Sequence, residues 1–130
     1  MKALHPPGWP RPKGYSNGIS ARGRMIFTAG VVGWNEEESF VAQDMVGQLR
    51  QILVNTLAIL AEDGAGPKHI VRMTWYVTDR SEYIANIREI GAVYRELFGK
   101  HFPAMAVVQV AALVEPAARI EIETTAMVPE

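Results

Sequence analysis

Two carboxylates near the C-terminus have a spacing that could support chemistry. Glu121 and Glu123 lie two residues apart in an alternating segment, so on a β-strand both side chains point to one face of a sheet. A carboxylate that is desolvated in a cleft can take up a proton or orient an attacking water molecule. The residues alone favour a simpler interpretation, a pair of salt-bridged residues at an interface. The arginines that could serve as partners are Arg24, Arg72 and Arg119.

Other catalytic arrangements are missing from the sequence. It contains no cysteine, which excludes thiolate nucleophiles, disulfides and cysteine-bound metals. The three histidines, His5, His69 and His101, are too far apart for a ligand pair such as His-x-x-x-His, so no metal site is expected. No serine lies in a Gly-x-Ser-x-Gly elbow, and the short glycine-rich segment 64–67 reads as a helix stop rather than a phosphate loop. The residues therefore point to no cofactor.

The composition is that of one globular domain. Of the 130 residues, 48% are hydrophobic and 21% are charged, which excludes an intrinsically disordered chain. A count of 13 basic residues against 14 acidic ones gives a net charge of −1, so nucleic acid is not an expected partner. No apolar stretch approaches the roughly 20 residues of a membrane span, and residues 1–13 lack the apolar segment of a signal peptide. We therefore expect a cytoplasmic protein with no membrane association.

Hydrophobic spacing divides the chain into a short arm and one domain. Residues 1–14 hold four of the eight prolines, which predict a non-helical arm. Residues 15–130 form the predicted domain, with the element order β-β-α-β-α-β-β. Because each helix has one apolar stripe, both can cover one face of a mixed sheet, which predicts an α+β two-layer sandwich. The predicted strands are Tyr15–Ala21, Met25–Val32, His69–Thr78, Ala104–Ala112 and Arg119–Met127, and the predicted helices are Phe40–Asp63 and Asp79–Gly99.

The segment Arg22-Gly23-Arg24 predicts the first contact between strands. A glycine-containing connection of this length commonly joins the two strands of a β-hairpin. We therefore expect Tyr15–Ala21 to pair with Met25–Val32.

Alternation in the last two strands predicts a sheet with one open face. Ile120 and Ile122 suit packing against helices, whereas Glu121 and Glu123 lie on the other face. The residues expected beside these carboxylates on the preceding strand are Met105, Val107 and Gln109. An apolar patch of this kind usually marks an interface or a ligand groove, so we expect other copies of the chain to cover it.

Several short motifs resemble those of one known family. They are Gly14-Tyr15-Ser16, Phe27-Thr28-Ala29-Gly30, Thr74-Trp75-Tyr76-Val77-Thr78-Asp79, Phe102-Pro103-Ala104 and Ile120-Glu121-Ile122-Glu123. Together with the order of elements, they resemble the reactive-intermediate deaminase family (RidA, also called YjgF) from about residue 15 to residue 128. The resemblance implies a chorismate-mutase-like fold. It also implies a homotrimer in which the sheets form a central barrel and three small-molecule clefts lie between subunits.

The resemblance also implies roles for particular residues. The best-known family members hydrolyse reactive 2-imino or enamine acids to 2-keto acids and ammonia, and the first glutamate of the closing strand, here Glu121, positions the water. A family arginine that binds the substrate carboxylate corresponds to Met105, and a family cysteine corresponds to Val107. A family asparagine corresponds to Gly91 in a loose alignment. The implied substrate-binding positions are Tyr15, Ala29, Gly30, Gly91, Met105 and Val107.

The missing arginine changes the expected substrate. Burying a carboxylate without a partner costs several kcal/mol, so a 2-imino acid should bind poorly beside Met105. The leading hypothesis is a RidA-like trimer that hydrolyses a non-standard imine or enamine. The first alternative is a non-catalytic small-molecule binding or chaperone-like protein of the same fold. An endoribonuclease or translation inhibitor is a lower alternative, because the net charge is negative.

Overall fold

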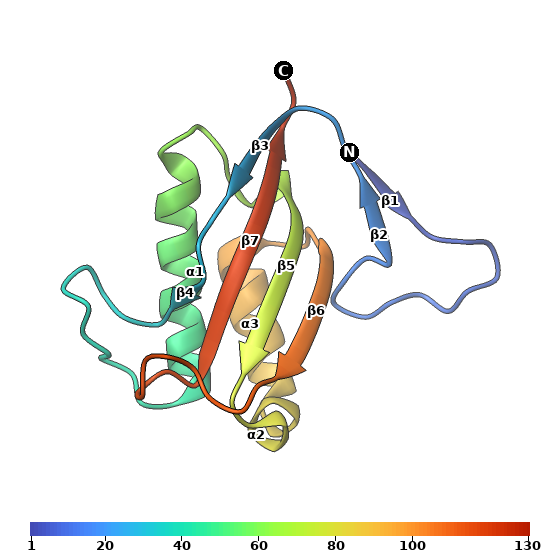
Figure 1. Ribbon diagram of the computed structural model, residues 1–130. Helices are drawn as coiled ribbons and strands as arrows, with labels where there is room; N and C mark the ends of the chain where they lie inside the picture. The colour runs from blue at the N-terminus through green and yellow to red at the C-terminus, as the bar shows by residue number, and fades with distance from the viewer.

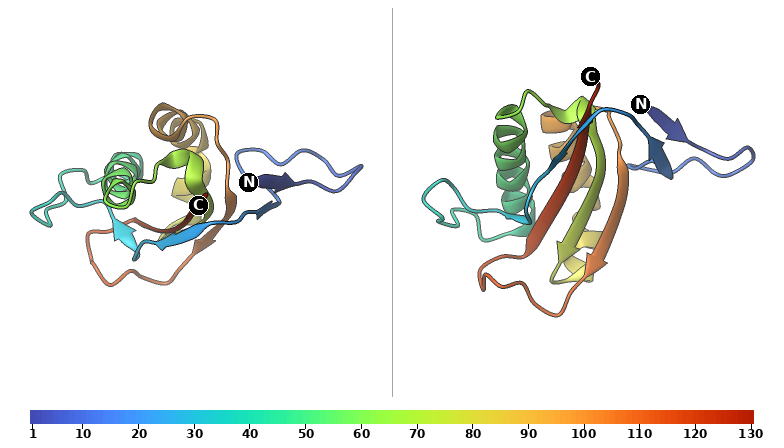
Figure 2. Two further views of the ribbon diagram at one scale, coloured as in Figure 1. Left: turned by 90° about the horizontal axis from the view of Figure 1, so that it is seen from above. Right: turned by 45° about the horizontal axis from the view of Figure 1, so that its top comes forward.

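The computed structural model describes residues 1–130 and has two layers (Figure 1). The strands of the main sheet are β3 (Arg24–Phe27), β4 (Val31–Val32), β5 (Ile70–Val77), β6 (Ala104–Gln109) and β7 (Ile120–Val128), and the helices are α1 (Met45–Ala61), α2 (Arg80–Ala85) and α3 (Ile87–Phe98). The strand order is β3-β7-β5-β6, and β4 also pairs with β7. Helices α1 and α3 lie on the same face of this sheet (Figure 2). The predicted α+β sandwich with a mixed sheet is confirmed.

The hydrophobic core lies between the sheet and these two helices. On β7, the alternate residues Ile120, Ile122 and Ala126 have no exposed surface, as their spacing predicted. Helix α1 supplies the facing side chains, chiefly Leu49, Ile52, Leu53 and Leu60, all completely buried. Removing this much apolar surface from water is the main force that holds the helix layer on the sheet.

A side-chain cap decides where α1 begins. The Asp44 side chain accepts a hydrogen bond of 3.0 Å from the backbone N–H of Gly47, which satisfies one of the free donors of the first turn. The helix therefore starts at Met45, five residues later than Phe40, where the apolar pattern placed its start. None of the helices combines the length and the hydropathy that are needed to cross a membrane.

The second predicted helix is divided into α2 and α3 at Asn86. Its start is as predicted, because the Asp79 side chain accepts hydrogen bonds from the backbone N–H groups of Ser81 and Glu82 at 2.9 and 3.2 Å. The Asn86 side chain donates to the carbonyl of Glu82 at 2.8 Å, and its backbone leaves the helical region at φ −110°. Asparagine favours such local bonds over a continuous helix, which explains the division.

The predicted hairpin between the first two strands is wrong. Strand β2 (Gly18–Ser20) pairs with β1 (Lys2–Leu4), and β3 pairs antiparallel with β7. In the second pairing Ile26 lies opposite the buried Ala126 and packs against the core, which buries apolar surface that a hairpin out on the arm would leave in water. The β1–β2 ribbon projects to one side of the sheet (Figure 1).

The register of β6 contradicts the predicted composition of the open face. Strand β6 runs parallel to β5, with Met105 beside Met73 and Val107 beside Trp75. Neighbouring residues at one level of a sheet point to the same side, and Met73 and Trp75 are buried under the helices. The side chains of Met105 and Val107 therefore lie on the helix face, and the prediction that they lie beside the carboxylates is wrong.

The open face combines exposed apolar groups with carboxylates. Phe27, Met25 and Val108 are 66%, 52% and 43% exposed, and the register places all three on the side of Glu121 and Glu123. The apolar character that the sequence indicated for this face is therefore present, but other residues supply it. A patch of this type is typical of a surface that another protein chain covers.

One fully buried polar side chain ties α1 to the segment that enters β7. The Gln48 side-chain amide donates to the carbonyls of Ala42 and Ala117 at 3.2 and 2.9 Å, and its oxygen accepts from the backbone N–H of Arg119 at 2.8 Å. Since Gln48 itself has no exposed surface, its amide depends on these backbone groups for its hydrogen bonds.

We expect Gln48→Ala to lower the free energy of unfolding by about 3 kcal/mol, because it removes three hydrogen bonds that contribute about 1 kcal/mol each. Urea denaturation followed by circular dichroism measures the change. The control is Gln51→Ala on the same helix, whose bond to Asn55 at 2.8 Å is local. That variant should lose no more than about 0.5 kcal/mol. Equal losses in the two variants would contradict the role given to Gln48.

Candidate functional site

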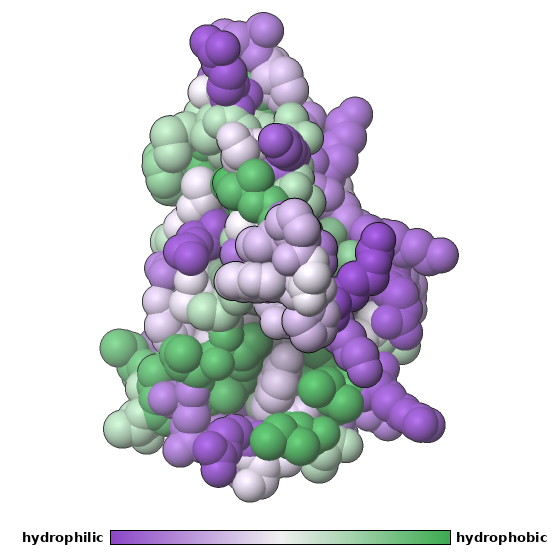
Figure 3. Space-filling model, turned by 90° about the vertical axis from the view of Figure 1, so that its right-hand side faces the viewer, coloured by the Kyte–Doolittle hydropathy of each residue, from purple (hydrophilic) through white to green (hydrophobic).

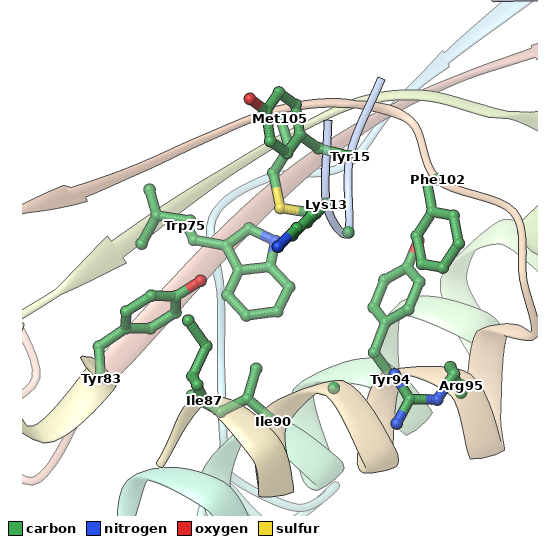
Figure 4. A pocket seen from close by; sticks show the side chains of 13 residues that line it. Lys13, Tyr15, Trp75, Tyr83, Ile87, Ile90, Tyr94, Arg95, Phe102 and Met105 are labelled. Carbon is green, nitrogen blue, oxygen red and sulfur yellow. The ribbon is translucent and has the colours of Figure 1, made fainter. Parts of the chain in front are cut away.

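A cavity of about 490 Å³ lies on the helix side of the edge strand β6. Its walls come from β5, β6, α2, α3, the segment before β6 and the arm, so distant parts of the sequence meet there (Figure 4). Figure 3 views the side of the molecule that carries the arm. Hydrophobic atoms gather in its lower half, toward the end where α2 lies, and hydrophilic groups border them.

Four of the predicted substrate-binding residues line this cavity. Tyr15 comes directly after the arm, Gly91 from α3, and Met105 and Val107 from β6. The parallel pairing of β5 and β6 aims both β6 side chains at the helices, which is what brings them to the cavity. The spacing of Met105 and Val107 did not predict this position, because both faces of their strand are apolar and the two residues were expected on the open face.

Aromatic side chains form two walls of the cavity. Trp75 and Tyr83 meet edge to face, with ring centroids 6.4 Å apart. Tyr94 stacks on Phe102, with centroids 5.9 Å apart and planes within 17°. The hydroxyl of Tyr94 donates to the carbonyl of His101 at 2.8 Å, and burial raises the pKa of its phenol. The phenol therefore stays neutral, and the surroundings suit an apolar or aromatic ligand.

One buried donor in the cavity wall has no partner. The indole Nε1–H of Trp75 makes no hydrogen bond, although the residue is only 2% exposed. Leaving such a group unpaired costs about 1–3 kcal/mol. A ligand atom that accepts a hydrogen bond would recover part of this cost.

Two cations line the cavity, and sequence reasoning missed both. Lys13 lies in the arm, and Arg95 belongs to a part of α3 that the apolar pattern assigned to the solvent. A Cβ added at Gly91 would stand 3.1 Å from Nη1 of Arg95, so the guanidinium lies close to that glycine. The available signal was the spacing, since residues four apart share one helix face.

The other predicted site residues form a second group, away from this cavity. Glu121 lies beside Tyr76 on the open face, and its carboxylate packs so closely on Gly30 that a Cβ there would stand 2.2 Å from Oε2. Ala29 precedes Gly30, and both line a shallower hollow next to α1. Within one chain, Glu121 and Met105 therefore lie on opposite faces of the sheet.

Within one chain none of the candidate arginines pairs with these carboxylates, so salt bridges to them at an interface stay a prediction. Arg24 pairs with Asp63, and Arg119 pairs with Glu82 at 3.2 Å. Glu123 instead accepts a hydrogen bond of 2.6 Å from the hydroxyl of Tyr76, which raises the pKa of that phenol.

Neither Glu121 nor Glu123 takes part in any ion pair of the chain. Arg72, the third candidate partner, lies on the open face beside Ala104 and Thr125. No three histidine, aspartate or glutamate side chains gather in a way that could hold a metal ion.

Comparison with known proteins assigns the family. The sequence model of the family described as Endoribonuclease L-PSP matches residues 10–128. A RutC family protein of Pasteurella multocida is 34% identical over 105 residues, which are 81% of each chain. The 2-iminobutanoate/2-iminopropanoate deaminase of Salmonella typhimurium is 33% identical over 116 residues, 87% of this chain and 86% of that one. The chain belongs to this family, the YjgF/RidA family that its motifs indicated.

A solved structure shows the same fold at similar identity. The Rid family protein YyfB from Yersinia pestis superimposes with a TM-score of 0.86 and 32% identity over 98% of both chains. A structure from Mycobacterium tuberculosis, Rv2704 of the YjgF/YER057c/UK114 family, has a TM-score of 0.66 and 34% identity over 88% of this chain and 87% of that one.

Proposed function

We propose that this protein is an imine or enamine hydrolase that works as a homotrimer, with its substrate in clefts between subunits. The family relationship supports the reaction class, because one relative at 33% identity is a 2-iminobutanoate/2-iminopropanoate deaminase. The observation that carries the proposal is the aromatic cavity, where Tyr15, Gly91, Met105 and Val107 converge. A cavity with such walls would hold a small organic molecule in one orientation.

The open face supports the assembly. Its exposed Phe27, Met25 and Val108 gain by leaving water, and packing them against further copies of the chain would remove that surface from solvent. The proposal requires assembly to bring Glu121 of one subunit to the cavity of the next, because the two lie on opposite faces of the sheet within a single chain.

In the proposed reaction Glu121 orients a water molecule. Water adds to the imine carbon while the carboxylate accepts one of its protons and passes it to the imine nitrogen. The remaining hydroxyl proton of the adduct then moves to nitrogen, the C–N bond breaks, and ammonia and a carbonyl product leave with the carboxylate regenerated. Gly30 has no side chain, so the Glu121 carboxylate can lie directly on the backbone there. A positioned carboxylate of this kind typically speeds such a step by about 10²- to 10⁴-fold.

Met105 is the reason why the proposed substrate differs from the 2-imino acids of the best-known family members. A thioether has no charge and donates no hydrogen bond, so it cannot pair with a carboxylate. The proposed substrate is therefore an imine or enamine with an apolar or aromatic body that does not place a carboxylate against Met105.

A non-catalytic binding or chaperone-like protein is the second candidate. The observation that favours it is the absence of any acidic side chain from the cavity of a single chain. The two candidates differ in one measurable respect, because only the hydrolase needs the carboxylate of Glu121. The ribonuclease activity suggested by the family's description is less favoured, since the net charge is −1.

We expect light scattering to report about three times the chain mass for the wild-type protein. Phe27→Glu should shift the mass toward that of a monomer, because it places a charge in the covered face. Val54→Glu is the control, since Val54 is also exposed but belongs to α1 on the other layer. A monomeric wild-type protein would contradict both the assembly and the clefts.

Replacing the carboxylate tests the reaction. Glu121→Gln should leave the assembly intact and lower kcat at least about 100-fold. The assay generates a panel of imines in situ with amine and amino-acid oxidases, and the substrate is the imine that the wild-type protein hydrolyses fastest. Glu123→Gln is the matched control and should keep most of the activity, because that carboxylate is bonded to Tyr76. Full turnover by Glu121→Gln would refute the hydrolytic role and favour another mechanism.

Met105→Arg tests the missing anchor. The wild-type protein should hydrolyse 2-iminobutyrate poorly, and the substitution should raise kcat/KM about tenfold or more, because a guanidinium can bind the carboxylate through two hydrogen bonds. The assay generates the imine with an amino-acid oxidase and follows its hydrolysis. Met105→Leu keeps the site apolar and should bring no gain. Rapid turnover of 2-iminobutyrate by the wild-type protein would overturn the assignment to a non-standard substrate.

A further inference from the structure

We infer that the cavity takes an anionic ligand with an aromatic body, and that Arg95 and Lys13 bind its anionic group. This inference rests on the proposed function, since it concerns the ligand of the same cavity. Both residues line the cavity and are exposed, so they stand at its mouth, whereas Trp75 lies at its inner wall.

The charge around the cavity is unbalanced. Arg95 and Lys13 are the charged residues that line it, and no carboxylate lines it. Neither of them takes part in an ion pair of the chain. The acidic residue next to Arg95 is unavailable, because Glu96 binds Arg50 of α1 through two contacts of 2.6 and 3.0 Å. In the proposed assembly the partner subunit's Glu121 would supply one negative charge here, which leaves one of the two positive charges for an anionic ligand.

Gly91 of α3 leaves room for the side chain of Arg95. Gly91 is one helical turn before Arg95, and its missing side chain lets the guanidinium approach the helix at the cavity wall. A guanidinium at this place can offer its planar fork to a carboxylate or a similar oxyanion. Figure 4 shows Arg95 on the helix side of the cavity and Met105 on the sheet side.

One uncharged polar group of the cavity also lacks a hydrogen-bond acceptor. The buried indole N–H of Trp75 is unpartnered, and its ring forms part of the wall (Figure 4). The hydroxyl of Tyr94 is already used as a donor to His101. A ligand with oxygen atoms can accept from the indole and the cations, while the aromatic walls hold its body.

The position of the cations favours ligands longer than the shortest acids. The cations stand at the mouth and the β6 wall offers only Met105 and Val107, so the anionic group must lie toward α3 and the arm. A ligand needs a spacer between this group and the part that lies against β6. The predicted class is therefore aryl or arylalkyl carboxylates and related oxyanions rather than short 2-imino acids.

A matched pair of probes tests the inference. The probes are 2-naphthylacetate and 2-naphthylacetamide, which differ only in charge, and binding to the full-length protein is measured by isothermal titration calorimetry at pH 7. We expect the acid to bind at least tenfold more tightly than the amide, a difference of about 1.4 kcal/mol. Arg95→Gln should reduce this ratio to threefold or less, and Lys13→Gln should reduce it to a smaller extent.

Arg88→Gln is the control, because Arg88 is an exposed arginine of the same helix outside the cavity. It should keep the wild-type ratio. The inference is overturned if the wild-type protein binds acid and amide equally, if it binds neither, or if Arg95→Gln keeps the full preference for the acid.

The measurement is independent of turnover. If no imine is hydrolysed but the acid preference depends on Arg95, the hydrolase proposal fails and this inference stands. If Glu121→Gln abolishes hydrolysis while Arg95→Gln leaves the acid-to-amide ratio unchanged, the inference fails and the hydrolase proposal stands.

Discussion

Parallel pairing between β5 and β6 in a single register is the constraint on which the rest of this structure depends. It places Val107 beside Trp75 and Met105 beside Met73, so both β6 side chains face the helices. A slip of one residue would turn them to the open face and turn their neighbours inward. The cavity and its aromatic walls exist because this register is held, and the packing of Trp75 under the helices holds it.

The sheet therefore separates two kinds of chemistry within one chain. Its helix face carries the aromatic cavity, and its open face carries Glu121 beside Gly30. A carboxylate on one face cannot reach a ligand on the other through a packed layer of backbone. Under the proposed function, the two meet only when one copy of the chain lies beside another. The exposed apolar groups of the open face provide the driving force for that arrangement.

Under the inferred ligand class, a family site changes its ligand without a change of fold. Met105 leaves the β6 wall apolar, and the available positive charge comes from Arg95 on α3 and Lys13 in the arm. A charge on a helix or an arm meets a different part of the ligand from a charge on the strand. In the inferred complex the position of this positive charge sets the length of the ligand. The unpaired indole N–H of Trp75 favours a ligand with an oxygen atom that accepts a hydrogen bond.

Local patterns in the sequence were enough for the layers, the family and part of the site. The alternation of β7 predicted its buried face, Asp79 predicted a helix start, and the motifs around Tyr15 and Glu121 indicated the family. Which strands pair, and which face each side chain takes, were decided only by the tertiary structure. Strand β3 joined β7 rather than β2, and β6 turned Met105 to the helices. Both outcomes depend on pairing between distant segments, and because side chains alternate with a period of two, an offset of one residue reverses every face.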